Sequence, residues 1–250
     1  MLFAMIAGIC FAVLIILLLL YVLPMFFMHP LASGKIEGTD IITVKNRINN
    51  LFFISIGNES DRHANTENAD WIVIDAGSDA VRVKREMERM SIDRNRVKAV
   101  FLTHTDYDHV DSITLFPNAM IYMSRQEKQM IDGSTYRQFI KKNSLPELKD
   151  SNKIIYLSDC EIVELPEHKM RMIWVPGHTK GSAMYVLDEK YLFTGDAFKI
   201  TKDRISVHPY TMDKKTARET LQAIKGELKN YEKVFTAHYG LIENDISVRG

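Results

Sequence analysis

The feature that most constrains the fold of this 250-residue chain is a group of polar side chains directly after an apolar run. Residues 98–103 read KAVFLT, a run typical of a buried β-strand, and His104, Asp106, Asp108 and His109 follow at once. A loop after a strand can turn such groups toward one point. Imidazole and carboxylate are ligands that zinc, iron and manganese accept. Taken alone, the cluster fits a metal site and a polar surface loop equally well.

Three further candidate ligands favour the metal site. His178, Asp196 and His238 each lie after or between β runs, and each directly follows a glycine or an alanine. A small neighbour lets the backbone approach a site without crowding it. Because these residues lie far apart in the sequence, we expect their loops to gather at one sheet edge.

Short strands alternate with amphipathic helices along the rest of the chain. Helical spacing of apolar residues predicts one helix over residues 79–90, capped by Asp79, and a second from Asp213 to Leu228. Runs rich in Val, Ile, Phe or Tyr predict strands over residues 50–56, 71–75, 98–103, 119–123, 153–157, 170–175, 183–187, 191–194 and 233–236. This order predicts two packed sheets with helices on their outer faces.

The first 27 residues contain no charged side chain, and residues 2–23 would span roughly 30 Å as a helix. We predict a transmembrane anchor over residues 1–27, a linker over 28–40 and a catalytic domain over 41–250. A cleaved signal peptide, the competing interpretation, requires a basic start and a shorter apolar core. Lys35, Lys45 and Arg47 follow the span and no basic residue precedes it, which favours a cytoplasmic domain.

Composition narrows the partner classes. Lys plus Arg and Asp plus Glu number 32 each, so the formal net charge is zero and nucleic acid is not an expected partner. The two cysteines, Cys10 and Cys160, form no metal-binding or redox motif and imply no disulfide framework. Oligomeric state is not predicted.

Six segments, in order, resemble the metallo-β-lactamase superfamily, including its glyoxalase II-like and lactonase-like hydrolases, across residues 41–250. The segments are NNLFFISI, WIVIDAGSD, THTDYDHVDS, VPGHTKGSAMYV, LFTGDAF and FTAHYG. The resemblance implies an α+β fold, a four-layer αββα sandwich with a metal groove at the sheet edges. It also implies two divalent ions, zinc foremost: the first held by His104, Asp106 and His178, the second by Asp108, His109 and His238, with Asp196 bridging.

Two positions depart from the common family pattern. Asp106 stands where H-x-H-x-D-H has its second histidine, so the motif here reads H-x-D-x-D-H. A carboxylate makes the first site harder and more negative, which favours iron, manganese or magnesium relative to zinc, or weakens that site. Asp111 replaces a usual glycine and is interpreted either as a hydrogen-bond acceptor for a ligating histidine or as a solvated loop residue.

The resemblance implies hydrolysis of an ester, thioester or lactone by a metal-bridged hydroxide, with Asp108 and Asp196 as catalytic residues. Tyr107, His208 and Tyr239 are expected to line the groove for a small-molecule substrate. A membrane-associated phosphodiesterase or nuclease is the main alternative, and a redox di-iron protein is another. A non-catalytic, membrane-tethered sensor or scaffold would keep the fold without the chemistry.

Overall fold

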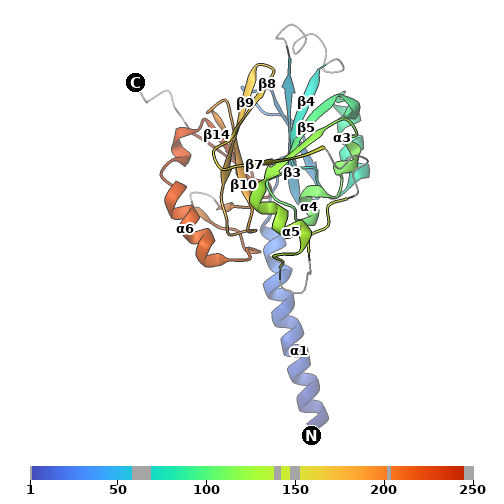
Figure 1. The fold of residues 1–250 in the computed structure, drawn as a ribbon. Coiled ribbons are helices and arrows are strands. Elements are labelled where there is room, and N and C mark those ends of the chain that lie inside the picture. The colour runs from blue at the N-terminus through green and yellow to red at the C-terminus, as the bar shows by residue number, and fades with distance from the viewer. Residues whose placement is uncertain (1, 58–68, 138–141, 147–152, 202–203, 245–250) are drawn as a thin grey trace.

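Two facing β-sheets form the centre of the protein (Figure 1). The computed structural model describes residues 2–57, 69–137, 142–146, 153–201 and 204–244. The first sheet has the order β1 (Gly34–Lys35), β2 (Ile41–Asn46), β3 (Asn49–Ile56), β4 (Asp70–Ile74), β5 (Val97–Phe101), β6 (Met120–Ser124) and β7 (Ile154–Leu157). The second has the order β15 (Leu241–Glu243), β14 (Lys233–Phe235), β11 (Tyr191–Phe193), β10 (Ala183–Leu187), β9 (His168–Trp174) and β8 (Ile162–Leu165). A separate hairpin joins β12 (Phe198–Thr201) to β13 (Arg204–Val207).

Strand β3 shows how the sheets are sandwiched. Its eight residues are all buried, and successive side chains point to opposite faces. Leu51 and Phe53 enter the core on the outer face of the first sheet, whereas Phe52 and Ile54 enter the core between the sheets. A strand buried on both faces lies in the middle of a layered structure.

Helices close the two outer faces. The helix α3 (Ala80–Arg89) packs Val83 and Met87 on the outer core of the first sheet, and α6 (Lys214–Ile224) packs Leu221 on the outer core of the second. The order of layers is therefore helix, sheet, sheet, helix, which confirms the expected αββα arrangement. Shorter helices in the described residues are α4 (Tyr107–Val110), α5 (Lys128–Asp132), η1 (Leu23–Phe27), η3 (Arg94–Arg96), η4 (Ile113–Leu115), η5 (Arg125–Glu127) and η7 (Leu228–Asn230).

All nine predicted strands are confirmed, as β3 to β7, β9 to β11 and β14, with small shifts at their ends. The predicted caps are also confirmed: Asp79 accepts a hydrogen bond from Arg82 N, and Asp213 accepts from Lys215 N and Thr216 N. The helix expected to reach Leu228 is shorter, because α6 ends at Ile224 and Leu228 begins η7. Sequence reasoning missed β2, and also β1, β8, β12, β13 and β15, which are short or lie at sheet edges or in the hairpin.

The N-terminal helix α1 (Leu2–Tyr21) projects away from the sandwich (Figure 1). The segment Met5–Phe27 is long and apolar enough to cross a membrane, with a mean hydropathy of 3.1, and its most apolar 18-residue stretch is 0% buried. The region predicted as a linker packs on the domain: β1 pairs with β2, and the backbone of Leu31 bonds the Asn50 side chain in both directions.

Phe53 offers a test of the outer core of the first sheet. Its ring is fully buried and packs edge-on against Phe116, with centroids 6.1 Å apart. Phe53→Ala is expected to lower the free energy of unfolding by about 3–5 kcal/mol, since a cavity would remain. Val81→Ala, at an 80% exposed position on α3, is the control and should change it by less than about 0.5 kcal/mol. Urea denaturation of the full chain in detergent measures both, and equal stabilities would contradict the assigned core.

Candidate metal centre

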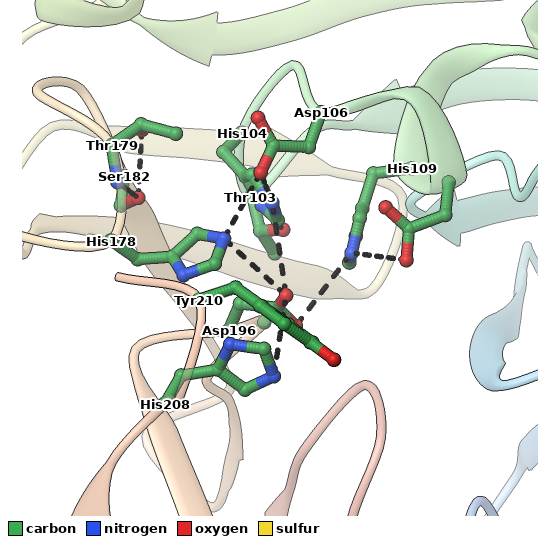
Figure 2. Close-up of polar contacts among 12 residues, drawn as sticks. Thr103, His104, Asp106, His109, His178, Thr179, Ser182, Asp196, His208 and Tyr210 are labelled. Carbon is green, nitrogen blue, oxygen red and sulfur yellow. Dashed lines mark hydrogen bonds and ion pairs between the residues drawn. The ribbon is translucent and has the colours of Figure 1, made fainter. Parts of the chain in front are cut away.

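The candidate ligands follow the ends of strands at one edge of the two sheets. His104, Asp106, Asp108 and His109 follow β5, while His178, Asp196 and His238 follow β9, β11 and β14. The strands β11 and β14 are parallel, and β9 and β11 both run antiparallel to β10, so all three end at the same edge. Figure 2 shows the side chains of His104, His109, His178 and His208 directed toward Asp196.

Glycines allow this close approach, as expected. Gly177 and Gly195 both have positive φ, at 138° and 51°. A Cβ at position 177 would lie 2.5 Å from Ala217, and one at position 195 would lie 2.5 Å from the Thr103 hydroxyl. A larger residue at either position would displace the loop that carries His178 or Asp196.

Asp196 faces two sets of ligands with its two oxygens. Its Oδ1 lies 3.1 Å from His238 Nε2 and 3.6 Å from His109 Nε2. Asp108 Oδ2 completes this set, 3.4 Å from His238 Nε2 and 3.6 Å from His109 Nε2. Ligands about 2.0–2.1 Å from a tetrahedral zinc ion lie about 3.3 Å from one another. The ligand atoms of Asp108, His109 and His238 all lie within 4.8 Å of one another, so these three groups have spacing that could hold one cation, with Asp196 Oδ1 facing both imidazoles.

The second oxygen of Asp196 faces the other set. Its Oδ2 lies 3.4 Å from His178 Nε2 and 4.0 Å from His104 Nε2. The ligand atoms of His104, His178 and Asp196 all lie within 4.8 Å of one another. Asp106 Oδ2 is close by, 3.4 Å from His104 Nε2 and 3.1 Å from His178 Nε2.

Several buried atoms at this centre lack a hydrogen-bond partner within the described part of the chain. They include His104 Nε2, His109 Nε2 and Asp196 Oδ1. An unsatisfied buried polar atom is costly, and these atoms converge from the loops after β5 and β11. Nitrogen and carboxylate donors of this kind fit divalent cations such as zinc.

Asp75, which sequence reasoning missed, orients the loop after β5. Its carboxylate accepts from Thr103 N at 2.8 Å and lies 2.8 Å from His109 Nδ1. With Nδ1 bonded to this carboxylate, the His109 Nε2 atom is directed at the metal centre. Asp75 has a φ of 58°, uncommon for a residue other than glycine. Asp111, the other candidate for this role, is exposed.

Other ligands are held in the same way. His238 Nδ1 lies 2.7 Å from the Ile48 carbonyl oxygen, and His104 Nδ1 lies 3.0 Å from the Thr103 hydroxyl. These contacts leave Nε2 of each ring free for a cation. The His238 contact also joins the metal centre to the turn between β2 and β3, where Ile48 lies.

Glu127 ties two ligand-bearing loops together. This fully buried carboxylate accepts from Thr105 N at 2.7 Å and from the Thr179 hydroxyl at 2.7 Å. It also accepts from Gly181 N at 3.1 Å, where a Cβ would lie only 2.0 Å from Glu127 N. Burial raises the pKa of Glu127. The hydrogen bonds fix the loop of His104 against that of His178.

Asp106 is engaged by Arg137, another residue that sequence reasoning missed. The guanidinium contacts both carboxylate oxygens, with Nε 3.0 Å from Oδ1. It also donates to the carbonyl oxygens of Tyr210 and His178, and Nη2 lies 3.0 Å from His178 Nε2. Asn143 Nδ2 donates to Asp106 Oδ1 at 3.0 Å. Asp106 stands where the common motif has a histidine, and its negative charge is balanced by the positive charge of Arg137.

The electrostatic surroundings differ between the groups of this cluster. Burial would raise the pKa of Asp196, but the imidazoles around it, His238 foremost, hold that pKa well below its usual range. Burial lowers the pKa of His178 to about 4 and that of His208 well below its ordinary value, so both rings are neutral. Burial would also lower the pKa of His109, but nearby carboxylates, Asp75 foremost, raise it well above the ordinary value.

The three residues predicted to line the substrate groove have different positions. Tyr107 is 66% exposed beside the cluster. Tyr239 is buried, and its hydroxyl has no hydrogen-bond partner in the segments that the structure describes. His208 is 1% exposed, and its Nε2 lies 3.8 Å from Asp196 Oδ2, within the metal centre itself.

The family model described as "Metallo-beta-lactamase superfamily" matches residues 66–238. This match covers more than half of the chain, and the chain belongs to that superfamily. Solved structures of the class share the fold. An archaeal superfamily protein from Sulfolobus tokodaii has a TM-score of 0.56 at 18% identity, covering 85% of this chain and 82% of that one. A subclass B3 metallo-β-lactamase of Bradyrhizobium japonicum has a TM-score of 0.62 at 15% identity, covering 85% and 79%.

Curated relatives are named as hydrolases. A probable polyketide biosynthesis zinc-dependent hydrolase of Bacillus subtilis is 30% identical over 175 residues, covering 67% of this chain and 66% of the relative. A hydroxyacylglutathione hydrolase of Glaesserella parasuis is 30% identical over 145 residues, covering 56% and 50%. The match thus spans less than two thirds of the length of these relatives.

Asp75→Asn tests how the loop after β5 is oriented. An amide at this position can direct its NH₂ group at His109 Nδ1, which moves the ring proton to Nε2 and blocks that ligand. We expect metal affinity to fall by about 10–100-fold, measured by competition with a chelator. Asp93→Asn, at the surface cap of η3, is the control and should leave affinity unchanged. An unchanged affinity in Asp75→Asn would show that Asp75 does not position His109.

Proposed function

We propose that this protein is a hydrolase that uses two divalent metal ions to cleave an ester, thioester or lactone. The arrangement of Asp196 carries the proposal: each of its two oxygens faces its own set of histidine and carboxylate ligands, as a carboxylate between two metal ions would. His104 and His178 belong to the first set, and Asp108, His109 and His238 to the second. Two bound ions would lower the pKa of a water molecule and supply a nucleophile near neutral pH.

The residues of the chain would position the reaction. Asp196 would fix the separation of the two ligand sets, and Asp108, whose side chain is 27% exposed, would accept or return a proton at its outward carboxylate oxygen. Tyr107 stands exposed beside Asp108 and would contact the substrate. Tyr239 lies deeper, with its ring edge-on to His208 at 5.7 Å, and would shape the inner wall of the groove.

The substrate class follows from the curated relatives and from charge. The hydrolases named above include a hydroxyacylglutathione hydrolase, whose name describes cleavage of an acyl compound. A formal net charge of zero gives no general attraction for nucleic acid, which supports a small-molecule substrate. A membrane-associated phosphodiesterase is the second candidate within the same fold, and a non-catalytic sensor or scaffold is the alternative of a different class.

Zinc is the proposed metal, with iron or manganese as alternatives. The first set already contains two imidazoles, and the second contains two more, which suits zinc. The name of the Bacillus subtilis relative, a probable polyketide biosynthesis zinc-dependent hydrolase, also supports zinc as the proposed metal.

The full chain purified in detergent tests the function directly. We expect about two metal equivalents and turnover of one member of a panel of lactone, thioester, ester, phosphodiester and β-lactam substrates. Asp196→Ala, Asp108→Ala and His178→Ala should each lower kcat/KM by about 10³-fold or more while thermal unfolding stays cooperative. Turnover retained in these variants would refute the metal mechanism. A folded protein that binds no metal after repletion would favour the scaffold.

We also propose that residues 1–27 anchor the domain in a membrane, with the catalytic domain on the cytoplasmic side. Support comes from the unburied apolar segment Met5–Phe27 and from the basic residues that follow it, Lys35, Lys45 and Arg47. A short packed segment, including β1, would then hold the metal centre close to the membrane surface.

Fractionation of cells tests this anchor. The full chain should remain in the membrane pellet after alkaline carbonate extraction, because a spanning helix resists it, whereas a variant lacking residues 2–27 should be soluble. External protease should spare the domain in intact cells. Release of the full chain by carbonate, or loss of the N-terminal segment from the mature protein, would instead support a signal sequence.

A further inference from the structure

His208 is a buried histidine whose ring nitrogens have no hydrogen-bond partner among the residues that the structure describes. Its side chain is 1% exposed, and neither Nδ1 nor Nε2 is hydrogen-bonded within this part of the chain. The residue directly follows β13, and its carbonyl oxygen accepts from Thr211 N and from the Thr211 hydroxyl, which fixes the turn. Burying two unsatisfied nitrogens costs free energy that ordinary packing would avoid with an apolar residue. The position therefore suggests a ligand for the ring.

The ring lies beside the Asp196 oxygen that also faces His178 and His104. His208 Nε2 is 3.8 Å from Asp196 Oδ2, against 3.4 Å for His178 Nε2 and 4.0 Å for His104 Nε2. The His208 and His178 rings meet edge-on with centroids 5.0 Å apart. The ligand atoms of His208, Asp196 and His238 also lie within 4.8 Å of one another. Three imidazoles thus surround one carboxylate oxygen at nearly equal distances.

Asp106 is a weaker candidate for the same place. Both of its oxygens are occupied by Arg137, and Oδ1 also accepts from Asn143. A carboxylate in a bidentate pair with arginine has most of its charge and its lone pairs already used. Moreover, the guanidinium lies 3.0 Å from His178 Nε2, so it would repel a cation there unless Asp106 kept it neutralised.

We propose that His208, rather than Asp106, is the fourth protein ligand of the first metal ion, beside His104, His178 and Asp196. Asp106 instead forms an ion pair that holds Arg137 against the His178 loop. The inference rests on the proposed metal-dependent function and assigns His208 a role different from lining the substrate groove. With three imidazoles and one carboxylate, the first site is suited to zinc despite the H-x-D-x-D-H motif.

The test is elemental analysis of the full chain in detergent, loaded with zinc and freed of excess metal. Wild type should hold about two zinc equivalents, and His208→Phe, which keeps a flat ring but removes both nitrogens, should hold about one. The double variant Asp106→Asn/Arg137→Gln removes both charges of the ion pair at once and should keep two. Asp93→Asn, at the surface cap of η3, is the control and should also keep two.

A stability measurement separates a ligand from a structural histidine. In the presence of chelator, His208→Phe should unfold at the same temperature as wild type or higher. A phenylalanine ring can be buried here without leaving unpaired polar nitrogens. Zinc should then raise the melting temperature of wild type more than that of the variant. A histidine with only a packing role would show the same zinc effect in both proteins.

Two results would overturn the proposal: two zinc equivalents in His208→Phe, or one equivalent in the double variant, which would make Asp106 the ligand. Because the readout is metal content, it is independent of the substrate. Two equivalents in wild type without turnover would refute the proposed hydrolysis and leave the ligand assignment to be decided by the variants. No zinc in wild type would refute both.

Discussion

The geometry of the site depends on one carboxylate, Asp196, buried among imidazoles. Burial disfavours its charge, and only the neighbouring rings keep its pKa low. The loops after β5, β9, β13 and β14, which supply those rings, must therefore meet closely around the loop after β11, which carries Asp196. The two sheets make this possible, because β5, β9, β11 and β14 all deliver their loops to one edge. Removing the carboxylate would leave several histidines crowded together without compensation.

A shell of buried hydrogen bonds holds these loops together. Asp75 and Glu127 act on opposite sides of the loop after β5, the first by holding Thr103 and His109, the second by joining Thr105 to Thr179 and Gly181. Neither is a candidate ligand. Both fix the direction of an imidazole through the backbone or through the far nitrogen, which is how outer groups tune metal sites. The glycines at 177, 181 and 195 complete the arrangement by leaving room for close contacts.

The substitution that makes the motif unusual is compensated elsewhere in the fold. Asp106 adds a negative charge, and Arg137 supplies the opposite one across 31 positions of sequence. Replacing both residues of such a buried ion pair together is tolerated better than replacing one, because a single remaining charge would be buried without its partner. His208, on the turn after the β12–β13 hairpin, brings an additional imidazole to the same centre.

The sequence by itself determined the layered fold, nine strands, both helix caps and the set of loops that meet at the sheet edge. Those features follow from local patterns: alternation of apolar residues, capping residues, and ligand residues placed after strands. It did not determine Asp75, Glu127 or Arg137, nor the place of His208 beside Asp196, because such roles depend on contacts between distant segments. From the sequence, His208 is expected to line the substrate groove, but its motif SVHPYT gives no sign that the ring is buried beside Asp196. Only the tertiary structure, by packing the hairpin against the second sheet, decided that its ring faces the metal centre.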